Sequence, residues 1–311
     1  MTAQRVIGVA LLVAALVAPW VAYPIFLMTA LCFALFACAF NLLLGYVGLM
    51  SFGHAMFFGI SGYFFGHVVK AWGMAPEVGI LAGVAGAAVL GAVTGALAIR
   101  RQGIYFAMIT LAFAQMIYFF CVQAPFTGGE DGLQGIARKP LLGGLIPTKD
   151  DRVLYYVVLA IFLFGYGTIY RIIHSPFGQV LKAIRDNEQR AVSLGYEADR
   201  YKLLAFVLSA ALAGLAGATK AMVLQFATLT DVSAAMSGEV VLMALVGGLG
   251  TIIGPVVGAF IIITMQNYLA ATGEFVLVIQ GVIFVVIVMA FRKGLVGELT
   301  DWWKSRRRAS S

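Results

Sequence analysis

Seven polar side chains in or beside long apolar runs are the residues whose types suggest chemistry. They are Asn41, Ser51, His54, Gln115, Lys220, Gln225 and Glu239. Polar groups inside a membrane cost free energy and are candidates to line a path for a polar solute, although each could also bridge two packed helices. Lys220 is the clearest candidate, because its ammonium either extends to water near the end of its run or faces an aqueous vestibule. Glu239 starts a short apolar segment and is expected at an interface.

The sequence contains no pattern typical of a catalytic, nucleotide-binding or metal site. A phosphate-binding loop of the form G-x-x-x-x-G-K-[ST] is absent, and Gly217–Lys220 has the wrong spacing for one. His54, His67 and His174 are far apart in the sequence, so we expect no metal-ligand cluster. No nucleophile elbow of the form G-x-S-x-G occurs. We therefore expect neither catalysis nor a metal or cofactor on this chain.

Composition indicates a membrane protein. Of the 311 residues, 62% are hydrophobic and only 11% are charged, a balance that no soluble domain of this size needs. The three cysteines, Cys32, Cys38 and Cys121, lie in apolar runs without metal-ligand spacing, so we expect packed thiols in the core. The net charge of +7 resides in loops and the C-terminal tail, as membrane orientation requires, and does not indicate nucleic acid binding.

Apolar runs long enough for spanning helices recur along the whole chain. They are Val6–Val21, Ile25–Leu44, Phe52–Val69, Val78–Ile99, Ile104–Val122, Val153–Tyr170, Leu203–Leu224, Val240–Leu249, Ile252–Leu269 and Phe275–Phe291. Val240–Leu249 covers only about half a bilayer at about 1.5 Å per residue. Two counts therefore stay open, ten spans or eight spans plus a re-entrant pair. In either case we predict an all-α, polytopic helical membrane protein in which residues 1–311 form one transmembrane domain.

Lysine and arginine predict the orientation of this domain. They collect in the central loop (Arg171, Lys182, Arg185, Arg190, Arg200, Lys202) and near the C-terminus (Arg292, Lys293, Lys304, Arg306, Arg307, Arg308). Because positively charged loops stay in the cytoplasm, we predict that both termini face the cytoplasm. Residues 172–202 are then a cytoplasmic loop, residues 123–152 an external loop and residues 292–311 a cytoplasmic tail.

The central loop contains the longest polar interval of the chain, Ser175–Lys202. Ser175 can cap a helix, and Pro176 suits its first turn. Apolar residues then recur near helical spacing as far as Val192, and Gly195 can end this helix in a left-handed conformation. A short amphipathic helix between two spans is a candidate docking surface for a soluble partner, and a solvated loop is the alternative.

Two glycine-rich breaks interrupt the apolar pattern, at Gly45–His54 and at Gly247–Pro255. Irregular backbone at membrane depth is tolerated only where protein or a water-filled cavity covers it. Short, glycine-interrupted segments in the two halves of a chain are typical of transport paths. We therefore expect a broken span or a re-entrant pair around the second break.

Three stretches carry a family resemblance that extends from about Asn41 to about Gln266. They are Gly45–Gly59, then Thr127–Leu133, then Ser175–Gly195 with its continuation at Gly247–Thr251 and Gly254-Pro255. In this order they resemble the permease subunits of ABC importers for branched-chain amino acids, the Liv-type family, and look most like its LivM-type subunit.

The resemblance implies that the central loop couples the permease to an ATPase. The general importer pattern, E-A-A followed after three residues by G, is matched here by Gln189-Arg190-Ala191 and Gly195, so two leading residues depart from it. The implied coupling residues are Ala183, Ile184, Arg185, Asp186, Glu188, Gln189, Arg190, Ala191 and Gly195. Candidates for an outer gate or for contact with a binding protein, with a plain turn as the alternative, are Thr127, Gly128, Gly129, Glu130 and Asp131.

The resemblance also implies a multi-pass permease subunit in the cytoplasmic (inner) membrane of a bacterium, in contact with membrane lipid. It would pair with a second homologous permease and dock two cytoplasmic ABC ATPase subunits, which bind the ATP and Mg. A soluble periplasmic or extracytoplasmic binding protein would deliver branched-chain amino acids (leucine, isoleucine or valine), with urea or short amides as the alternative. An ion-driven secondary carrier is the alternative from a different class, disfavoured because the apolar runs show no series of carboxylates.

Overall fold

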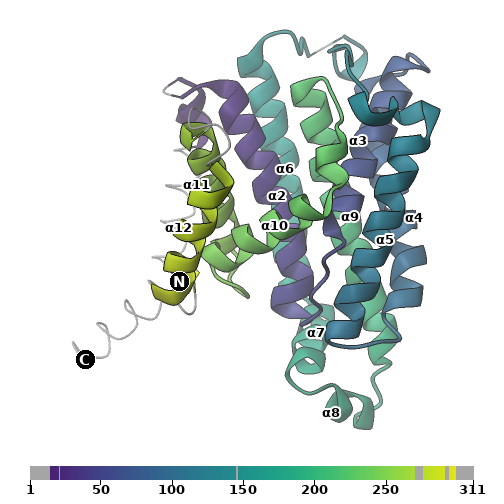
Figure 1. The fold of residues 1–311 in the computed structure, drawn as a ribbon, viewed down its shortest axis with the longest axis vertical. Helices are drawn as coiled ribbons and strands as arrows, with labels where there is room; N and C mark the ends of the chain where they lie inside the picture. Colours follow the sequence, from purple (N-terminus) through teal and green to yellow (C-terminus); the bar gives the residue numbers. More distant parts are fainter. Residues whose placement is uncertain (1–14, 21, 145, 270–275, 291–293, 299–311) are drawn as a thin grey trace.

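A computed structural model of the chain describes residues 15–20, 22–144, 146–269, 276–290 and 294–298. These residues form helices and two isolated bridges, without a strand in the described ranges (Figure 1). The helices are α2 (Pro24–Tyr46), α3 (His54–Lys70), α4 (Pro76–Ala98), α5 (Ile104–Gln123), α6 (Asp151–His174), α7 (Pro176–Asp186), α8 (Glu188–Ser193), α9 (Ala198–Leu224), α10 (Ala234–Gly247), α11 (Gly254–Leu269) and α12 (Val276–Ala290), with 3-10 turns η1 (Pro125–Thr127), η2 (Gly129–Asp131), η3 (Leu142–Gly144) and η4 (Leu229–Val232). The predicted all-α class is confirmed.

Five of the described helices, α2, α4, α5, α6 and α9, are long and apolar enough to cross a membrane. Helices α3, α10 and α11 are shorter, with 17, 14 and 16 residues. Residues 240–247 of the predicted run Val240–Leu249 lie in α10, which begins earlier, at Ala234, and ends at Gly247. The predicted span Val6–Val21 lies mostly outside the described residues, as does the predicted tail, and Phe275–Phe291 lies partly outside them.

The centre of the bundle is formed by α2 and α9. Helix α9 packs against α2, α3 and α4. It approaches α3 closely because Gly217 has no side chain, and a Cβ there would lie 1.8 Å from the carbonyl oxygen of Phe58. Small residues permit such backbone contact between membrane helices. The three cysteines are buried as free thiols, as their sequence positions predict.

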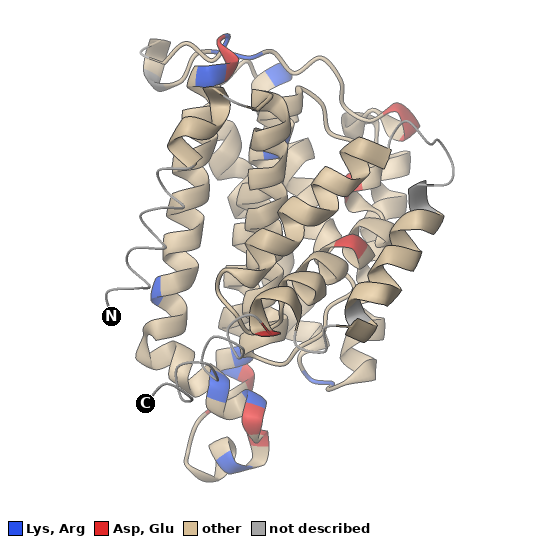
Figure 2. Cartoon of the chain, turned by 90° about the vertical axis from the view of Figure 1, so that its left-hand side faces the viewer, with Lys and Arg blue, Asp and Glu red and all other residues tan. Residues whose placement is uncertain are grey.

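Charged side chains gather at the two ends of the bundle, and few lie along its middle (Figure 2). Helices α7 and α8 lie together at one end, which we call the inner end after the predicted orientation (Figure 1). We call the opposite end, which carries the predicted external loop, the outer end. This distribution is the one that an apolar membrane interior favours.

Residues 225–233 connect α9 to α10 without forming an α-helix. Ala227 forms an isolated bridge with Leu133 of the external loop. The chain then returns into the bundle, where η4 packs beside the middle of α3. A Cβ on Gly59 there would lie 2.8 Å from the carbonyl carbon of Asp231. Residues 225–247 are therefore a broken element, extended in its first part and helical in its second.

The Ser175–Gly195 stretch forms two helices, and the prediction of a single helix was wrong. Ser175 caps α7 by accepting a hydrogen bond from the backbone N–H of Gly178 (3.3 Å), and Pro176 is in its first turn. The break is at Asn187, which has extended backbone and whose side chain accepts from the N–H of Arg190 to start α8. Asparagine competes with helical hydrogen bonding in this way. Gly195 has the predicted left-handed backbone, with φ of +90°.

Candidate coupling surface and buried polar sites

Helices α7 and α8 are fixed to the base of α9. Ile184 and Ala191 pack with Ala198 in a small apolar cluster separate from the main core. Glu188 forms an ion pair with Lys202, whose side chain is almost completely buried. Such contacts bind the loop to α9 as one body, so a force on α7 or α8 reaches the base of α9.

The nine predicted coupling residues divide between the interior and the surface. Six are exposed: Ala183, Arg185, Asp186, Gln189, Arg190 and Gly195. Ile184 and Ala191 are buried, and Glu188 is half-buried and turned toward Lys202. The structure therefore places these three in the internal packing of the loop.

Sequence reasoning missed an exposed apolar surface at the tip of the loop. Val192, Leu194 and Tyr196 are 54%, 71% and 40% exposed. We call these three residues the coupling tip. A single helix would have placed Val192 on the buried face, and the break at Asn187 turns it outward. Exposed apolar groups of this kind are typical of protein–protein contact sites when they cluster.

Arg185 and Asn41 join three elements at the inner end. The Nη1 of Arg185 donates to the carbonyl oxygen of Gly45 (2.5 Å) in the last turn of α2. Asn41 donates to the carbonyl of Thr251 (2.9 Å) and accepts from the N–H of Gly250 (3.0 Å). Residues 250 and 251 form the turn between α10 and α11. We call Asn41, Gly45, Arg185, Gly250 and Thr251 the inner junction.

Lys220 is buried and does not extend to water. Its ammonium forms an ion pair with Asp231 of η4, and the two residues are 8% and 7% exposed. The ammonium also lies 5.4 and 5.6 Å from the ring centroids of Phe33 and Phe58, within cation–π range. Sequence reasoning missed Asp231 because it falls in a polar connection, and only the return of that connection into the bundle brings it to Lys220.

Glu239 is half-buried on α10, where its carboxylate accepts a hydrogen bond from the side chain of Gln266 on α11. The expected interfacial position of Glu239 therefore becomes a contact between two packed helices. Lys220 and Asp231 are close enough to act electrostatically on this carboxylate. The Lys220–Asp231 pair thus lies just before α10, and Glu239 lies in the second turn of that helix.

His54 and Ser51 are fully buried at the start of α3. The Nε2 of His54 is 2.8 Å from the hydroxyl of Ser209, which in turn donates to the carbonyl of Ala39. Aromatic rings surround the imidazole, and its Nδ1 has no hydrogen-bond partner. The hydroxyl of Ser51 accepts from the N–H of Gly53 (3.3 Å). Both side chains make contacts that hold α3 in place.

The seven predicted path residues lie outside the apolar cavity beside the start of α5. Gln115 is half-buried on α5, and Gln225 is exposed at the end of α9, where its φ is +63°. A cavity of about 440 Å³ lies between residues 48–50 with Phe52 and the start of α5, and its apolar lining includes Met50, Phe52 and Met108. None of the seven residues lines it. Of the seven, Ser51 and His54 lie together at the start of α3, and Lys220 acts electrostatically on Glu239.

The predicted gate residues of the external loop form turns at the end of α5. Thr127 is buried, and its hydroxyl donates to the carbonyls of Cys121 and Ala124. Gly128 and Gly129 have φ of +82° and +65°, and Glu130 and Asp131 are exposed at the surface.

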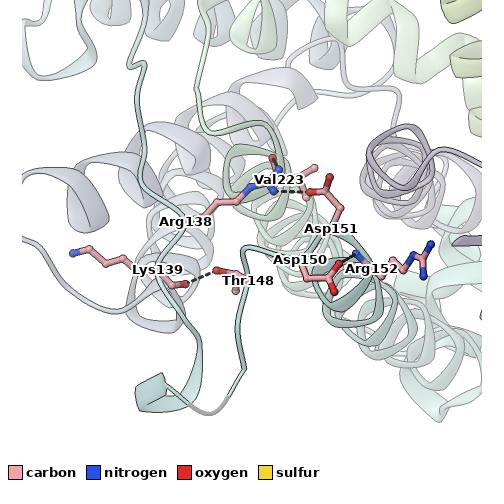
Figure 3. A network of polar contacts seen from close by, with 7 residues as sticks. All are labelled: Arg138, Lys139, Thr148, Asp150, Asp151, Arg152 and Val223. Carbon is pink, nitrogen blue, oxygen red and sulfur yellow. Dashed lines mark hydrogen bonds and ion pairs between the residues drawn. The ribbon is translucent and has the colours of Figure 1, made fainter.

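Further along, Arg138 fixes the external loop to two helices (Figure 3). Its guanidinium donates to Asp151 at the start of α6 (2.6 Å) and to the carbonyl of Val223 near the end of α9 (2.8 Å). Together with the bridge to Ala227, this contact places the loop directly over the entry to residues 225–233.

The fold and these two ends define a polytopic helical membrane protein of the permease class. A family model described as branched-chain amino acid transport system / permease component matches residues 22–288. The chain belongs to this family. Among the described residues no cluster of three or more His, Cys, Asp or Glu could hold a metal ion.

Curated relatives include both amino acid and sugar permeases. The chain is 27% identical over 282 residues to the high-affinity branched-chain amino acid transport system permease protein LivM of Escherichia coli strain K12, a match covering 82% of this chain and 65% of that protein. It is 30% identical over 177 residues to the ribose import permease protein RbsC of Bacillus subtilis strain 168, covering 53% and 51%. It is 27% identical over 154 residues to the xylose transport system permease protein XylH of Escherichia coli strain K12, covering 47% and 38%. No solved structure matches the chain.

Proposed function

We propose that this chain is the transmembrane permease subunit of an ATP-driven ABC importer that moves branched-chain amino acids into the cytoplasm. The observation that carries the proposal is the coupling tip, where Leu194 is 71% exposed on a loop otherwise fixed to the bundle. An apolar surface on a rigid helix pair suits docking into a groove of a soluble protein. We assign that groove to a cytoplasmic ATPase subunit.

The proposed mechanism uses the loop as the point where force enters the membrane domain. Two ATPase subunits bind ATP and Mg, close on each other and displace α7 and α8. Because Glu188 and Lys202 bind this loop to α9, the displacement reorients α9 and the helices packed on it. With a second homologous permease this motion gives alternating access. ATP hydrolysis takes place on the partner subunits, and the helices of this chain change their orientation in response.

The proposed substrate follows from the family and from the relative named for branched-chain amino acids. Ribose and xylose permeases are also similar over about half of the chain, so we assign high-affinity selection of the solute to a soluble binding protein. The external loop, with Glu130 and Asp131 exposed, is the proposed contact for that protein.

The buried carboxylate Asp231 bears on the alternative of an ion-driven carrier. Such a carrier needs an intramembrane carboxylate free to exchange its ion. Asp231 instead forms an ion pair with Lys220, which leaves the pair without net charge. This contact favours the ATP-driven importer.

The test begins with purification of the chain from native membranes in mild detergent and identification of co-purifying proteins by mass spectrometry. The complex is then reconstituted in liposomes, and uptake of labelled leucine is measured with the binding protein outside and ATP inside. We expect a second permease and ATPase subunits, and uptake that requires ATP. Uptake by the chain alone along an ion gradient would contradict the proposal, and uptake of urea in place of leucine would change the substrate.

A further inference from the structure

We propose that the inner junction transmits the motion of α7 to the α10–α11 hairpin, with Arg185 and Asn41 as its positioning residues. The inference rests on the proposed function, because it concerns how ATPase-driven motion enters the membrane domain. Sequence reasoning placed Arg185 among the residues that face the ATPase. Here Arg185 also has a contact inside the permease, with the carbonyl of Gly45.

The first step is the contact between α7 and α2. The last four carbonyls of a helix lack partners within the helix, and a cation near them is stabilised by the helix dipole. Gly45 provides such a carbonyl, because the N–H of Leu49 donates to the carbonyl of Leu43 and not to that of Gly45. Arg185 donates to the carbonyl of Gly45. The other side of the guanidinium contacts Asp186 at 3.1 and 3.2 Å. Arg185 is therefore held in one orientation between its own helix and the end of α2.

The backbone just after α2 packs against the aliphatic part of the Arg185 side chain. Gly48 has a φ of +81°, and a Cβ on it would lie 2.9 Å from the Cγ of Arg185. The guanidinium and this aliphatic part thus contact α2 and its exit at two points. A displacement of α7 cannot leave this segment in place without breaking both contacts.

The second step is the contact between α2 and the α10–α11 turn. Asn41 lies one turn before Gly45 and is 3% exposed. Its amide uses both its donor and its acceptor on the backbone of Gly250 and Thr251, so the pair of hydrogen bonds fixes the turn in position and in direction. Buried polar groups are costly when unpaired, and this cost opposes separation of the turn from α2.

The third step is the rigidity of the hairpin itself. A Cβ on Gly247 would lie 1.9 Å from the carbonyl oxygen of Gly254, and one on Gly258 would lie 1.9 Å from that of Met243. Helices α10 and α11 therefore touch backbone to backbone. The hydroxyl of Thr251 donates to the carbonyl of Gly248 (2.7 Å) and accepts from the N–H of Gly254 (3.1 Å). A force on this turn moves both helices together.

The consequence is a continuous chain of contacts from the central loop (residues 172–202), which we call the coupling loop, to the charged residues at the start of α10. One end of α10 lies at the junction. Its other end is capped by Ser233, which directly follows η4, the segment that contains Asp231. An element with contacts at both ends can carry a displacement between them, but such a path requires direct evidence of energetic coupling. The experiment therefore measures coupling between the two positioning residues.

The variants are Arg185→Gln, Asn41→Leu and their combination. Arg171→Gln removes the same charge at the inner end of α6, and Asn267→Leu makes the same change at an exposed position of α11; both are controls. Arg185→Lys keeps the charge but lacks the fork that reaches Gly45 and Asp186 together. Two quantities are measured: leucine taken up per ATP hydrolysed by the reconstituted complex, and hydrogen exchange of residues 248–253 in the purified chain without partners.

We expect uptake per ATP hydrolysed to fall about tenfold in each single variant, and ATP hydrolysis is measured in each, because Arg185 is also among the predicted ATPase-coupling residues. The combined variant should be no worse than the more impaired single variant, because both residues act on one path. Exchange at Gly250 should be roughly tenfold faster in Asn41→Leu, through loss of one buried hydrogen bond, and unchanged in the controls. Uptake per ATP in Arg185→Lys should be about as low as in Arg185→Gln, because lysine lacks the planar fork.

Unchanged uptake per ATP in both single variants would overturn the inference, as would additive losses in the combined variant. Unaltered exchange at Gly250 in Asn41→Leu would overturn it without any reference to transport. Failure of the proposed function looks different, since the unmodified complex would then show no ATP-dependent uptake at all.

Discussion

The inner junction and the buried Lys220–Asp231 pair both hold the broken element 225–247 in the bundle, the junction through the turn that follows it, but they do so by different physical means. The junction joins neutral backbone carbonyls and N–H groups to an amide and to a guanidinium whose side chain is 40% exposed. The pair joins two full charges, each less than a tenth exposed, beside two phenylalanine rings.

This difference predicts different behaviour during transport. The hydrogen bonds of the junction contribute about 1 kcal/mol net where both groups are neutral and about 1.5–3 kcal/mol where the guanidinium donates, and they can be exchanged for others. A buried ion cannot lose its partner without a cost of roughly 3–5 kcal/mol. We therefore expect the hydrogen bonds of the junction to rearrange before the pair separates, so that a displacement carried by α10 reaches the Lys220–Asp231 pair with its ion pair intact.

The largest effect is expected for Lys220→Met. Asp231 would become a buried carboxylate without a partner, so the free energy of unfolding should fall by about 3–5 kcal/mol. Thermal and denaturant unfolding in detergent measures this change. Combining it with Asp231→Leu should recover most of the loss, since two charges are then replaced by apolar groups.

Arg200→Gln is the control for that measurement. It breaks the ion pair with Glu197, whose side chains are 80% and 60% exposed, and should cost less than about 1 kcal/mol. Wild-type stability in Lys220→Met would show that the Asp231 carboxylate is accessible to water, and the contrast between the two regions would no longer hold.

Gly45→Ala tests the junction from the packing side. A Cβ there would lie 2.4 Å from the Oδ1 of Asn41 and 2.7 Å from the N of Gly250, so the α10–α11 turn must shift. We expect a loss of about 1–3 kcal/mol, measured by the same unfolding experiment. Gly167→Ala on α6 meets no atom within 4 Å and should be neutral or slightly stabilising. Equal stability of the two variants would place the turn farther from α2 than the structure has it.

Local signals predicted most of the helices. Apolar runs of spanning length predicted α2, α4, α5, α6 and α9. A helix makes all its backbone hydrogen bonds within its own segment, so a long apolar run is enough to predict one. Ser175, Pro176 and Gly195 acted at their predicted positions in the coupling loop, since caps and left-handed turns depend on neighbouring residues only. The break at Asn187 is also local, and the competing side-chain hydrogen bond was the signal for it.

The two long-range contacts on which the proposals rest were beyond local reasoning. Asp231 meets Lys220 only because residues 225–233 turn back into the bundle, and no periodicity marks that return. Arg185 has the spacing of a surface residue on α7, yet its guanidinium contacts Gly45, which is 140 residues away in sequence. Both contacts depend on how distant helices are placed, which helix propensity and hydropathy do not determine.

Gly195→Val examines the link between the coupling tip and the junction. The position has a φ of +90° and open space around a Cβ, so the cost is backbone strain of about 1–2 kcal/mol without a clash. We expect insertion into the membrane to be retained and uptake per ATP to fall, because the turn that orients the tip changes. Gly195→Asn, which tolerates the left-handed region better, should keep more of the wild-type coupling. Full uptake by Gly195→Val would remove this turn from the coupling mechanism.

The smallest effect on stability is expected for Leu194→Ser, and it gives the sharpest contrast with the interior of the same loop. Leu194 is 71% exposed, so the free energy of unfolding should change by less than about 0.5 kcal/mol. Its burial against an ATPase subunit would contribute about 1.5–3 kcal/mol, and retention of that subunit in a pull-down should fall by at least about tenfold. Ile184→Ser, the same kind of change at a 3% exposed position, should instead destabilise the loop. If Leu194→Ser kept its partners and Ile184→Ser alone lost them, the docking surface would lie on α7, and force would enter the junction at Arg185 directly.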